Sequence, residues 1–272
     1  MSPTPQRPVF RFRSVFISDI HLGFKGCSAE YLLDFLRSIE VETLYLVGDI
    51  VDLWSLKRTF YWPESHQAVL AELFEHARRG TRVVYIPGNH DAMFRAHDGD
   101  TFANVEIRRQ AIHTMADGRR FLVLHGDEFD TVIKTSPLLE VLGNHAYSFV
   151  LELNRYVNWA RRRFGLPYWS IAAYLKHKVK NAVQYIANFE RAVADEARRR
   201  GVDGVICGHI HRAGIADVDG ITYCNDGDWV ESCTTLAEDH EGRLTLLRWT
   251  ERKEVLTRAT PHFVGVPVEH AA

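Results

Sequence analysis

Five short polar blocks, each directly after an apolar run, constrain this chain more than any other feature. The blocks are Asp19-Ile20-His21, Gly48-Asp49-Ile50-Val51-Asp52, Gly88-Asn89-His90-Asp91, His125-Gly126-Asp127 and Gly208-His209-Ile210-His211. The runs that precede them, which predict buried strands, are Val15-Phe16-Ile17, 44–47, 83–86, 121–124 and 204–207. Because the strand ends of an open α/β sheet share one crevice, the polar side chains of the blocks are expected to converge in space.

Helical patterns alternate with these strands, so the first part of the chain reads βαβαβ. Helices are predicted over 28–39, with Ser28 as the N-cap, and over 64–79, where Gly80 closes the helix. Three later runs, over 213–218, 221–224 and 244–249, alternate with turns. We expect these runs in a second, more antiparallel sheet.

A different pattern occupies the stretch from about Ile133 to Arg200, where long amphipathic helices are broken at Phe164-Gly165-Leu166-Pro167. This stretch leaves the core after the fourth block and returns before the fifth. We therefore predict a core formed by residues 1–132 and 203–272, and a helical cap inserted at 133–202 that lies over the convergent side chains.

Composition limits the class of protein. With 272 residues and a formal net charge of −2, the chain is long enough for one enzyme-sized domain and has no overall charge that would favour nucleic acid. The four cysteines form no CxxC pair, which argues against a disulfide framework or a thiolate zinc site. We expect a cytoplasmic protein, because no signal peptide or membrane-spanning stretch is evident.

The residue types of the five blocks indicate a two-metal centre. Aspartate, histidine and asparagine without thiolates suit a divalent ion such as Mn²⁺, Fe²⁺ or Zn²⁺. Two such ions can activate water and neutralise a phosphoryl oxygen during displacement at phosphorus. One block alone would be weak evidence, because Gly-Asp and Gly-Asn pairs are common in turns and a lone histidine is usually structural. Five blocks, each after a strand, are specific.

The blocks resemble the calcineurin-like metallophosphoesterase superfamily, whose pattern is DxH, GDxxD, GNH[D/E], H and GHxH. All five elements are present. The resemblance implies that Asp19, His21 and His211 hold one metal, that Asn89, His125 and His209 hold the other, and that Asp49 bridges both. It also implies a metallophosphoesterase-type double-sheet sandwich flanked by helices.

The same resemblance gives two further residues a catalytic role. His90 is expected beside the phosphate rather than on a metal, where it stabilises charge or protonates the leaving oxygen. Asp52 would accept a hydrogen bond from His90 and fix its tautomer.

The core motifs together with the cap resemble a bacterial group within this superfamily, the UDP-2,3-diacylglucosamine pyrophosphohydrolases of lipid A synthesis. The resemblance implies two metals, typically Mn²⁺, and attack of water on the pyrophosphate to give UMP and a lipid monophosphate. It also implies an acyl-chain site in the cap. The apolar residues of the cap, followed by Arg161-Arg162-Arg163 and Tyr168-Trp169, suit peripheral contact with the inner membrane, and packing on the core is the alternative. In the cap, Arg155, Lys176, Lys180 and Asn181 are candidate substrate residues, with a solvated basic face as the alternative.

One block differs from that group. The group carries arginine in its third block, GNRD, whereas this chain has His90 in GNHD, the form used by general phosphoesterases. A soluble phosphomonoester, phosphodiester or nucleotide is therefore the alternative substrate. A catalytically silent protein that binds partners through its cap is the third reading, and the complete set of seven ligands and His90 argues against it.

Overall fold

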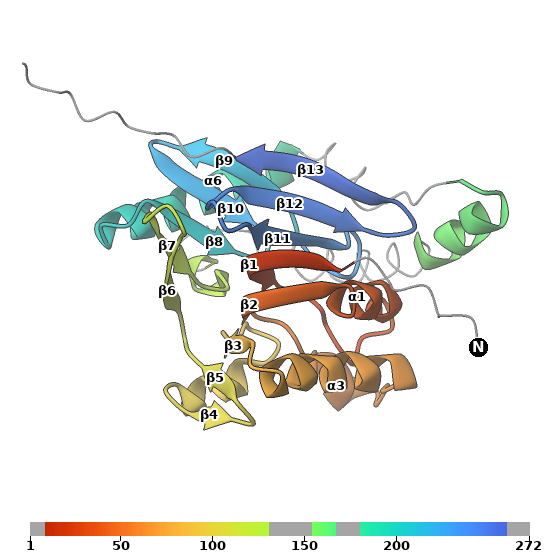
Figure 1. The fold of residues 1–272 in the computed structure, drawn as a ribbon. Helices are drawn as coiled ribbons and strands as arrows, with labels where there is room; N and C mark the ends of the chain where they lie inside the picture. Colours follow the sequence, from red (N-terminus) through yellow and green to blue (C-terminus); the bar gives the residue numbers. More distant parts are fainter. Residues whose placement is uncertain (1–8, 131–153, 167–179, 260–272) are drawn as a thin grey trace, which may run out of the picture.

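The computed structural model describes residues 9–130, 154–166 and 180–259, and these form two sheets with helices on both outer sides (Figure 1). Sheet 1 has eight strands, in the order β13-β12-β11-β1-β2-β3-β5-β4, and sheet 2 has five, in the order β6-β7-β8-β10-β9. The predicted α/β double-sheet sandwich is confirmed.

The strands of sheet 1 are β1 (Phe10–Ile17), β2 (Ile39–Leu46), β3 (Arg82–Tyr85), β4 (Thr101–Phe102), β5 (Val105–Ile107), β11 (Thr234–Glu238), β12 (Leu244–Trp249) and β13 (Lys253–Ala259). Those of sheet 2 are β6 (Ala111–Thr114), β7 (Arg120–Val123), β8 (Gly204–Cys207), β9 (Gly214–Val218) and β10 (Ile221–Asn225). In sheet 1, β1, β2, β3 and β5 run parallel, and in sheet 2, β7, β8 and β10 do. All five predicted strands before the polar blocks therefore lie in the parallel part of a sheet.

The helices are α1 (Ala29–Leu36), α2 (Leu53–Arg58), α3 (Glu64–Arg78) and α6 (Lys180–Arg199), with short 3-10 helices η1 (Ala92–His97) and η2 (Asp127–Phe129). Residues 154–163 are also helical. Within the described ranges, no helix combines the length and the apolarity that a bilayer crossing requires.

Strand alternation separates three apolar layers. In β1, Val15 and Ile17 pack with α1 and α3 on the outer face of sheet 1, whereas Phe16 points between the two sheets. The layer between the sheets contains Phe16 and Phe121, one from each sheet. A third layer joins the outer face of sheet 2 to α6. The two sheets are thus held face to face by an apolar layer, which fixes the loops at their edges.

The structure corrects two details of the sequence prediction. The first helix ends at Leu36 rather than at Ile39, because Ile39 begins β2. Ser28 is the N-cap residue as predicted, and its side chain makes no capping hydrogen bond. The run over 244–249 is β12 of sheet 1, where it pairs antiparallel with β11 and β13, and is not part of a second sheet. The runs over 213–218 and 221–224 do lie in the second sheet, as β9 and β10.

About half of the predicted cap, 133–202, lies outside the described residues, and the cap stays a prediction. Its last helix, α6, buries Phe189, Val193 and Ala197 against sheet 2, together with Leu122 and Val205. We therefore propose that the part of α6 from Phe189 onward belongs to the core, and that the inserted cap ends before it.

Candidate metal centre

The five polar blocks meet where the parallel strands of both sheets end. Backbone hydrogen bonds tie the blocks to one another: Asp19 N donates to Gly48 O (3.0 Å), and Gly208 N donates to His125 O (3.2 Å). A further bond joins the two sheets, because His209 N donates to the Asp19 carboxylate (2.9 Å). The expected convergence of the blocks is therefore observed.

Two glycines explain why the blocks can approach so closely. A Cβ on Gly48 would lie 2.2 Å from His125 Nδ1, and one on Gly88 would lie 2.2 Å from Asp49 Oδ1. Because any side chain at these positions would occupy the place of a polar group from another block, glycine is required there.

The predicted ligands themselves adopt unusual backbone angles. Left-handed φ values, between 50° and 68°, occur at Asp19, His21, Asp49, His209 and His211. This region costs roughly 1–2 kcal/mol for a residue other than glycine, and such strain collects at functional sites. The sharp turn at each strand end aims successive side chains into one space.

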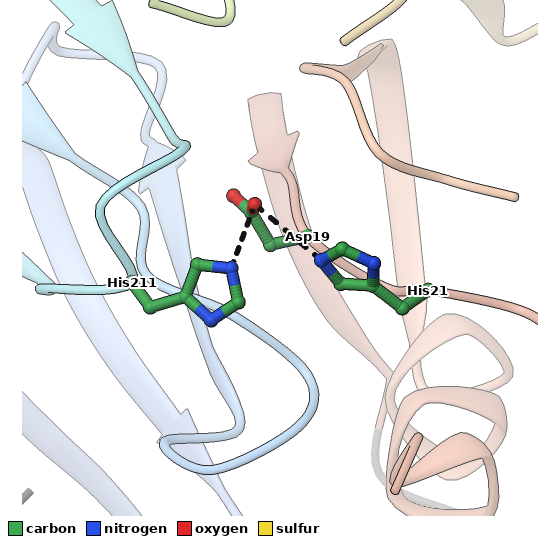
Figure 2. A group of neighbouring side chains, drawn as sticks. All are labelled: Asp19, His21 and His211. Carbon is green, nitrogen blue, oxygen red and sulfur yellow. Dashed lines mark ion pairs between the residues drawn. The ribbon is translucent and has the colours of Figure 1, made fainter. Parts of the chain in front are cut away.

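The first group of side chains is Asp19, His21 and His211, which face one another in Figure 2. His211 Nε2 lies 3.0 Å and His21 Nε2 lies 3.8 Å from Asp19 Oδ1. Asp19 Oδ1 and His21 Nε2 are buried, yet neither makes a hydrogen bond. Buried polar atoms normally have a hydrogen-bond partner, so these two atoms are placed as ligands of a cation would be. Atoms that each bind one metal ion at about 2.0–2.2 Å lie at such separations from one another.

The second group is centred on Asp49 and His125. His125 Nε2 lies 3.4 Å from Asp49 Oδ2 and 3.3 Å from Asn89 Oδ1. Its other nitrogen, Nδ1, donates to Val47 O (2.8 Å), which leaves Nε2 free to bind a cation. Asp49 Oδ2 also lies 3.9 Å from His21 Nε2 of the first group, so Asp49 stands between the two groups.

His209 is the predicted ligand that differs from the rest. Its Nε2 lies 2.9 Å from Asp130 Oδ2, and Tyr185 of α6 donates to the other oxygen of Asp130 (2.6 Å). The ring stays beside that of His125, with the ring centres 5.2 Å apart. Only Nδ1 of His209 therefore remains for a metal, and Asp130 would act as the carboxylate that orients it.

His90 and Asp52 have the relationship expected from the sequence. Since a carboxylate only accepts, His90 Nδ1 donates to Asp52 Oδ1 (2.9 Å), and His90 Nε2 lies 3.9 Å from Asp49 Oδ2. Asp52 is itself fixed, because it accepts hydrogen bonds from Ser55 N (2.7 Å) and Ser55 Oγ (2.8 Å) at the start of α2. The His90 ring lies over Trp54, with the ring centres 4.2 Å apart.

Charge in the centre is balanced between carboxylates and imidazoles. Burial opposes a charge on His21, but Asp19, Asp52 and Asp49 outweigh it and raise the pKa of His21 to about 10. Burial likewise opposes ionisation of Asp49, but His125 and His21 hold the pKa of Asp49 below its usual range. The centre thus favours ionised carboxylates beside positively charged groups. When divalent ions bind, they supply this positive charge and the histidines release their protons.

The sequence analysis missed a sixth block. The block Asn225-Asp226-Gly227-Asp228-Trp229 begins at the last residue of β10. Because β10 runs parallel to β8, this block lies at the same edge as the others. Burial raises the pKa of Asp226 well above its usual range. The Ser18 hydroxyl lies between the two blocks, with Oγ 2.6 Å from Asp226 Oδ1 and 2.5 Å from Asp19 Oδ2, so it can donate to either carboxyl group. The signal was the same as for the other blocks, an apolar strand followed directly by polar residues.

Asp91, the last residue of the third block, joins two blocks. Its carboxylate accepts hydrogen bonds from Gly88 N (2.6 Å), Ile50 N (2.8 Å) and Val51 N (3.4 Å). It thereby ties the Asp49 loop to the Asn89 loop.

Of the four predicted substrate residues, the structure describes the side chain of one. Arg155 is exposed, and its Nη1 donates to Lys25 O (3.3 Å). Lys176 lies outside the described residues, as do the side chains of Lys180 and Asn181 in the first turn of α6.

Comparison with known proteins assigns the class. The calcineurin-like phosphoesterase family model matches residues 12–213, so the chain belongs to this family. It is a metal-dependent phosphoester hydrolase, and the side-chain groups around Asp19 and Asp49 are its candidate metal-binding residues.

Similar curated proteins share one description. The chain is 27% identical, over 84% of its length and 95% of the relative's, to the UDP-2,3-diacylglucosamine hydrolase of Azotobacter vinelandii. It is 29% identical, over 76% of its length and 85% of the relative's, to the protein of that name from Pectobacterium carotovorum subsp. carotovorum. Among solved structures, YfcE, a phosphoesterase from E. coli, has a TM-score of 0.48 at 15% identity, with 90% of this chain and 97% of that chain covered.

Proposed function

We propose that the protein hydrolyses the pyrophosphate bond of UDP-2,3-diacylglucosamine or of a related amphipathic phosphoester, giving UMP and a lipid monophosphate. The observation that carries the proposal is the match to relatives named for this substrate over most of both chains. The centre has the donors that such a reaction needs, and an exposed cation, Arg155, donates to the backbone oxygen of Lys25, four residues after His21.

For the metals, we propose the assignment implied by the motifs. Asp19, His21 and His211 would hold one divalent ion, and Asn89, His125 and His209 the other. Asp49 would bridge them. The donors suit Mn²⁺, and Fe²⁺ or Zn²⁺ are compatible. The two unbonded buried atoms, Asp19 Oδ1 and His21 Nε2, support this assignment.

The chemistry is hydrolysis at phosphorus. The two ions, when bound, activate water as the nucleophile and neutralise charge on the phosphoryl oxygens. Oxygen from water forms a new bond to phosphorus while the bond to the leaving oxygen breaks. As an imidazolium whose Nδ1–H donates to Asp52, His90 would carry a second proton at Nε2, and it would transfer that proton to the leaving oxygen.

We also propose that the helix over 154–163 and the residues after it contact a lipid surface. Exposed apolar side chains gather there, with 65% of Tyr156, 62% of Trp159 and 81% of Phe164 accessible. Three consecutive arginines, 161–163, lie on the same segment. Aromatic and basic side chains together suit the interface of an anionic membrane.

The test is to incubate purified Mn²⁺-loaded protein with UDP-2,3-diacylglucosamine in detergent, and separately with an aryl phosphodiester. Release of UMP and the lipid monophosphate is the expected result, and Asp49→Asn protein is the inactive control. Hydrolysis of the aryl ester alone would contradict the proposed lipid substrate. It would favour a soluble phosphoester, the alternative that His90 in the third block suggests.

A further inference from the structure

A polar groove lies along the loop that follows the first block. It consists of two hollows, of about 210 and 440 Å³, whose linings share Lys25, Gly26, Tyr61 and Arg155. We call the two together the basic groove. It is lined by the loop after the first block, by α2, and by the helix over 154–163.

Hydrogen bonds connect the wall of the basic groove to His90 through Asp52. Ser55 lines the groove and donates two hydrogen bonds to Asp52, the residue that accepts from His90. Gly23, also in its wall, lies two residues after His21. The groove therefore starts one hydrogen-bonded residue away from the side chain expected to protonate the leaving oxygen.

The charge of the groove is positive. Its lining includes four cations, Lys25, Arg58, Arg155 and Arg162, and the acidic residue among the described lining is Glu30. Arg162 is engaged by Tyr31 and Glu251. Lys25, Arg58 and Arg155 are exposed and have no ion-pair partner among the described residues.

The cations are held at the groove by their surroundings. The Arg155 guanidinium donates to the backbone oxygen of Lys25, and the Lys25 ammonium lies 5.8 Å from the centre of the Tyr61 ring. On the same helix as Arg155, Asn154 and Asn158 are buried, which anchors the helix at the groove. Ammonium and guanidinium groups that lack a carboxylate partner favour a phosphate.

We propose that the basic groove binds the leaving half of the substrate when that half is itself a phosphomonoester. This inference rests on the proposed function, because a pyrophosphate is the ester whose leaving group carries a second phosphate. Release from phosphorus leaves that phosphate with an additional negative charge, which Lys25 and Arg155 would stabilise. The groove would thus select pyrophosphates over esters with an uncharged leaving half.

The experiment compares two substrates that share a transferred uridine monophosphoryl group. One is UDP-2,3-diacylglucosamine, and the other is the p-nitrophenyl ester of UMP, whose leaving group has no phosphate. In the Lys25→Ala/Arg155→Ala variant, the ratio of the two kcat/KM values is expected to fall about tenfold, as loss of roughly 1.4 kcal/mol of charge-assisted contact implies. The matched control is Lys57→Ala/Arg109→Ala, which removes the same two positive charges at exposed positions outside the groove and leaves the ratio unchanged.

A binding measurement separates this proposal from the proposed function. Calorimetric titration of glucose 1-phosphate into protein kept in EDTA is expected to show binding that weakens about tenfold in the Lys25→Ala/Arg155→Ala variant but not in the control. Equal affinities of wild type and variant for glucose 1-phosphate, or an unchanged ratio of the two kcat/KM values, would overturn the proposal that the groove binds the leaving phosphate. If wild-type protein leaves UDP-2,3-diacylglucosamine intact, the proposed function fails, and the calorimetry still decides whether the groove binds a phosphomonoester.

Discussion

His66 is expected to make the protein lose stability in mild acid. This residue of α3 is 2% exposed, and its Nδ1 accepts a hydrogen bond from Gly23 N (2.9 Å) in the loop after the first block. Burial lowers the pKa of His66 to about 4. Protonation would both charge a buried ring and remove the acceptor for the Gly23 amide.

The sign and size follow from linkage. In the unfolded chain the pKa of His66 is about 6.5, so between this value and about 4 the unfolded state binds more protons than the folded state. The stabilising contribution of neutral His66 is therefore complete above pH 6.5 and is lost as the pH falls toward 4. Between pH 8 and pH 5 the free energy of unfolding should drop by about 2 kcal/mol from this residue alone.

The assay is urea unfolding at pH 8 and at pH 5, in EDTA so that metal loss does not contribute, for wild type and for His66→Asn. Asparagine can keep an acceptor near the Gly23 amide but does not titrate. Between pH 8 and pH 5, the wild-type midpoint should fall by about 0.7 M more than that of the variant, for a slope of about 3 kcal/mol/M. Equal falls in the two proteins would refute the assignment of a depressed pKa to His66.

Four substitutions test the centre itself. Replacement of Asp49 by Asn should abolish turnover and leave at most one metal per chain by elemental analysis, and a variant that keeps both metals would contradict the bridge. His90→Asn should lower kcat by about 10²–10⁴ with metal content intact, whereas loss of metal would show that His90 is a ligand. Asp130→Asn should weaken binding of the second metal about 10–100-fold in a metal titration, because the His209 ring would lose the carboxylate that orients it. An unchanged affinity would rule out this role for Asp130. Asp91→Asn replaces one of the two acceptor oxygens, so a buried backbone N–H loses its partner. The free energy of unfolding in urea should fall by about 1–3 kcal/mol, and an unchanged value would show that other bonds hold the two loops together.

The centre was more predictable than the sheets around it. Each block is a local pattern, an apolar strand followed by polar residues, so sequence alone brought Asp19 and Asp49 to one edge. The strand β11, Thr234–Glu238, has no such pattern, because its two threonines are buried only once it pairs with β1 and β12. Since that pairing links residues far apart along the chain, neither β11 nor the sheet that holds β12 could be predicted locally. His66 likewise resembles a solvated histidine until α3 packs.

Each proposed metal would take ligands from both sheets. Asp19 and His21 follow β1 of sheet 1, whereas His211, which completes that group, follows β8 of sheet 2. Asp49 follows β2 of sheet 1, and His125, which faces it, follows β7 of sheet 2. The geometry of the centre is therefore set by the apolar layer between the sheets. Because the ligands also hold left-handed turns that cost roughly 1–2 kcal/mol each, neither sheet alone would keep them in place, and the packed sandwich is what makes the centre possible.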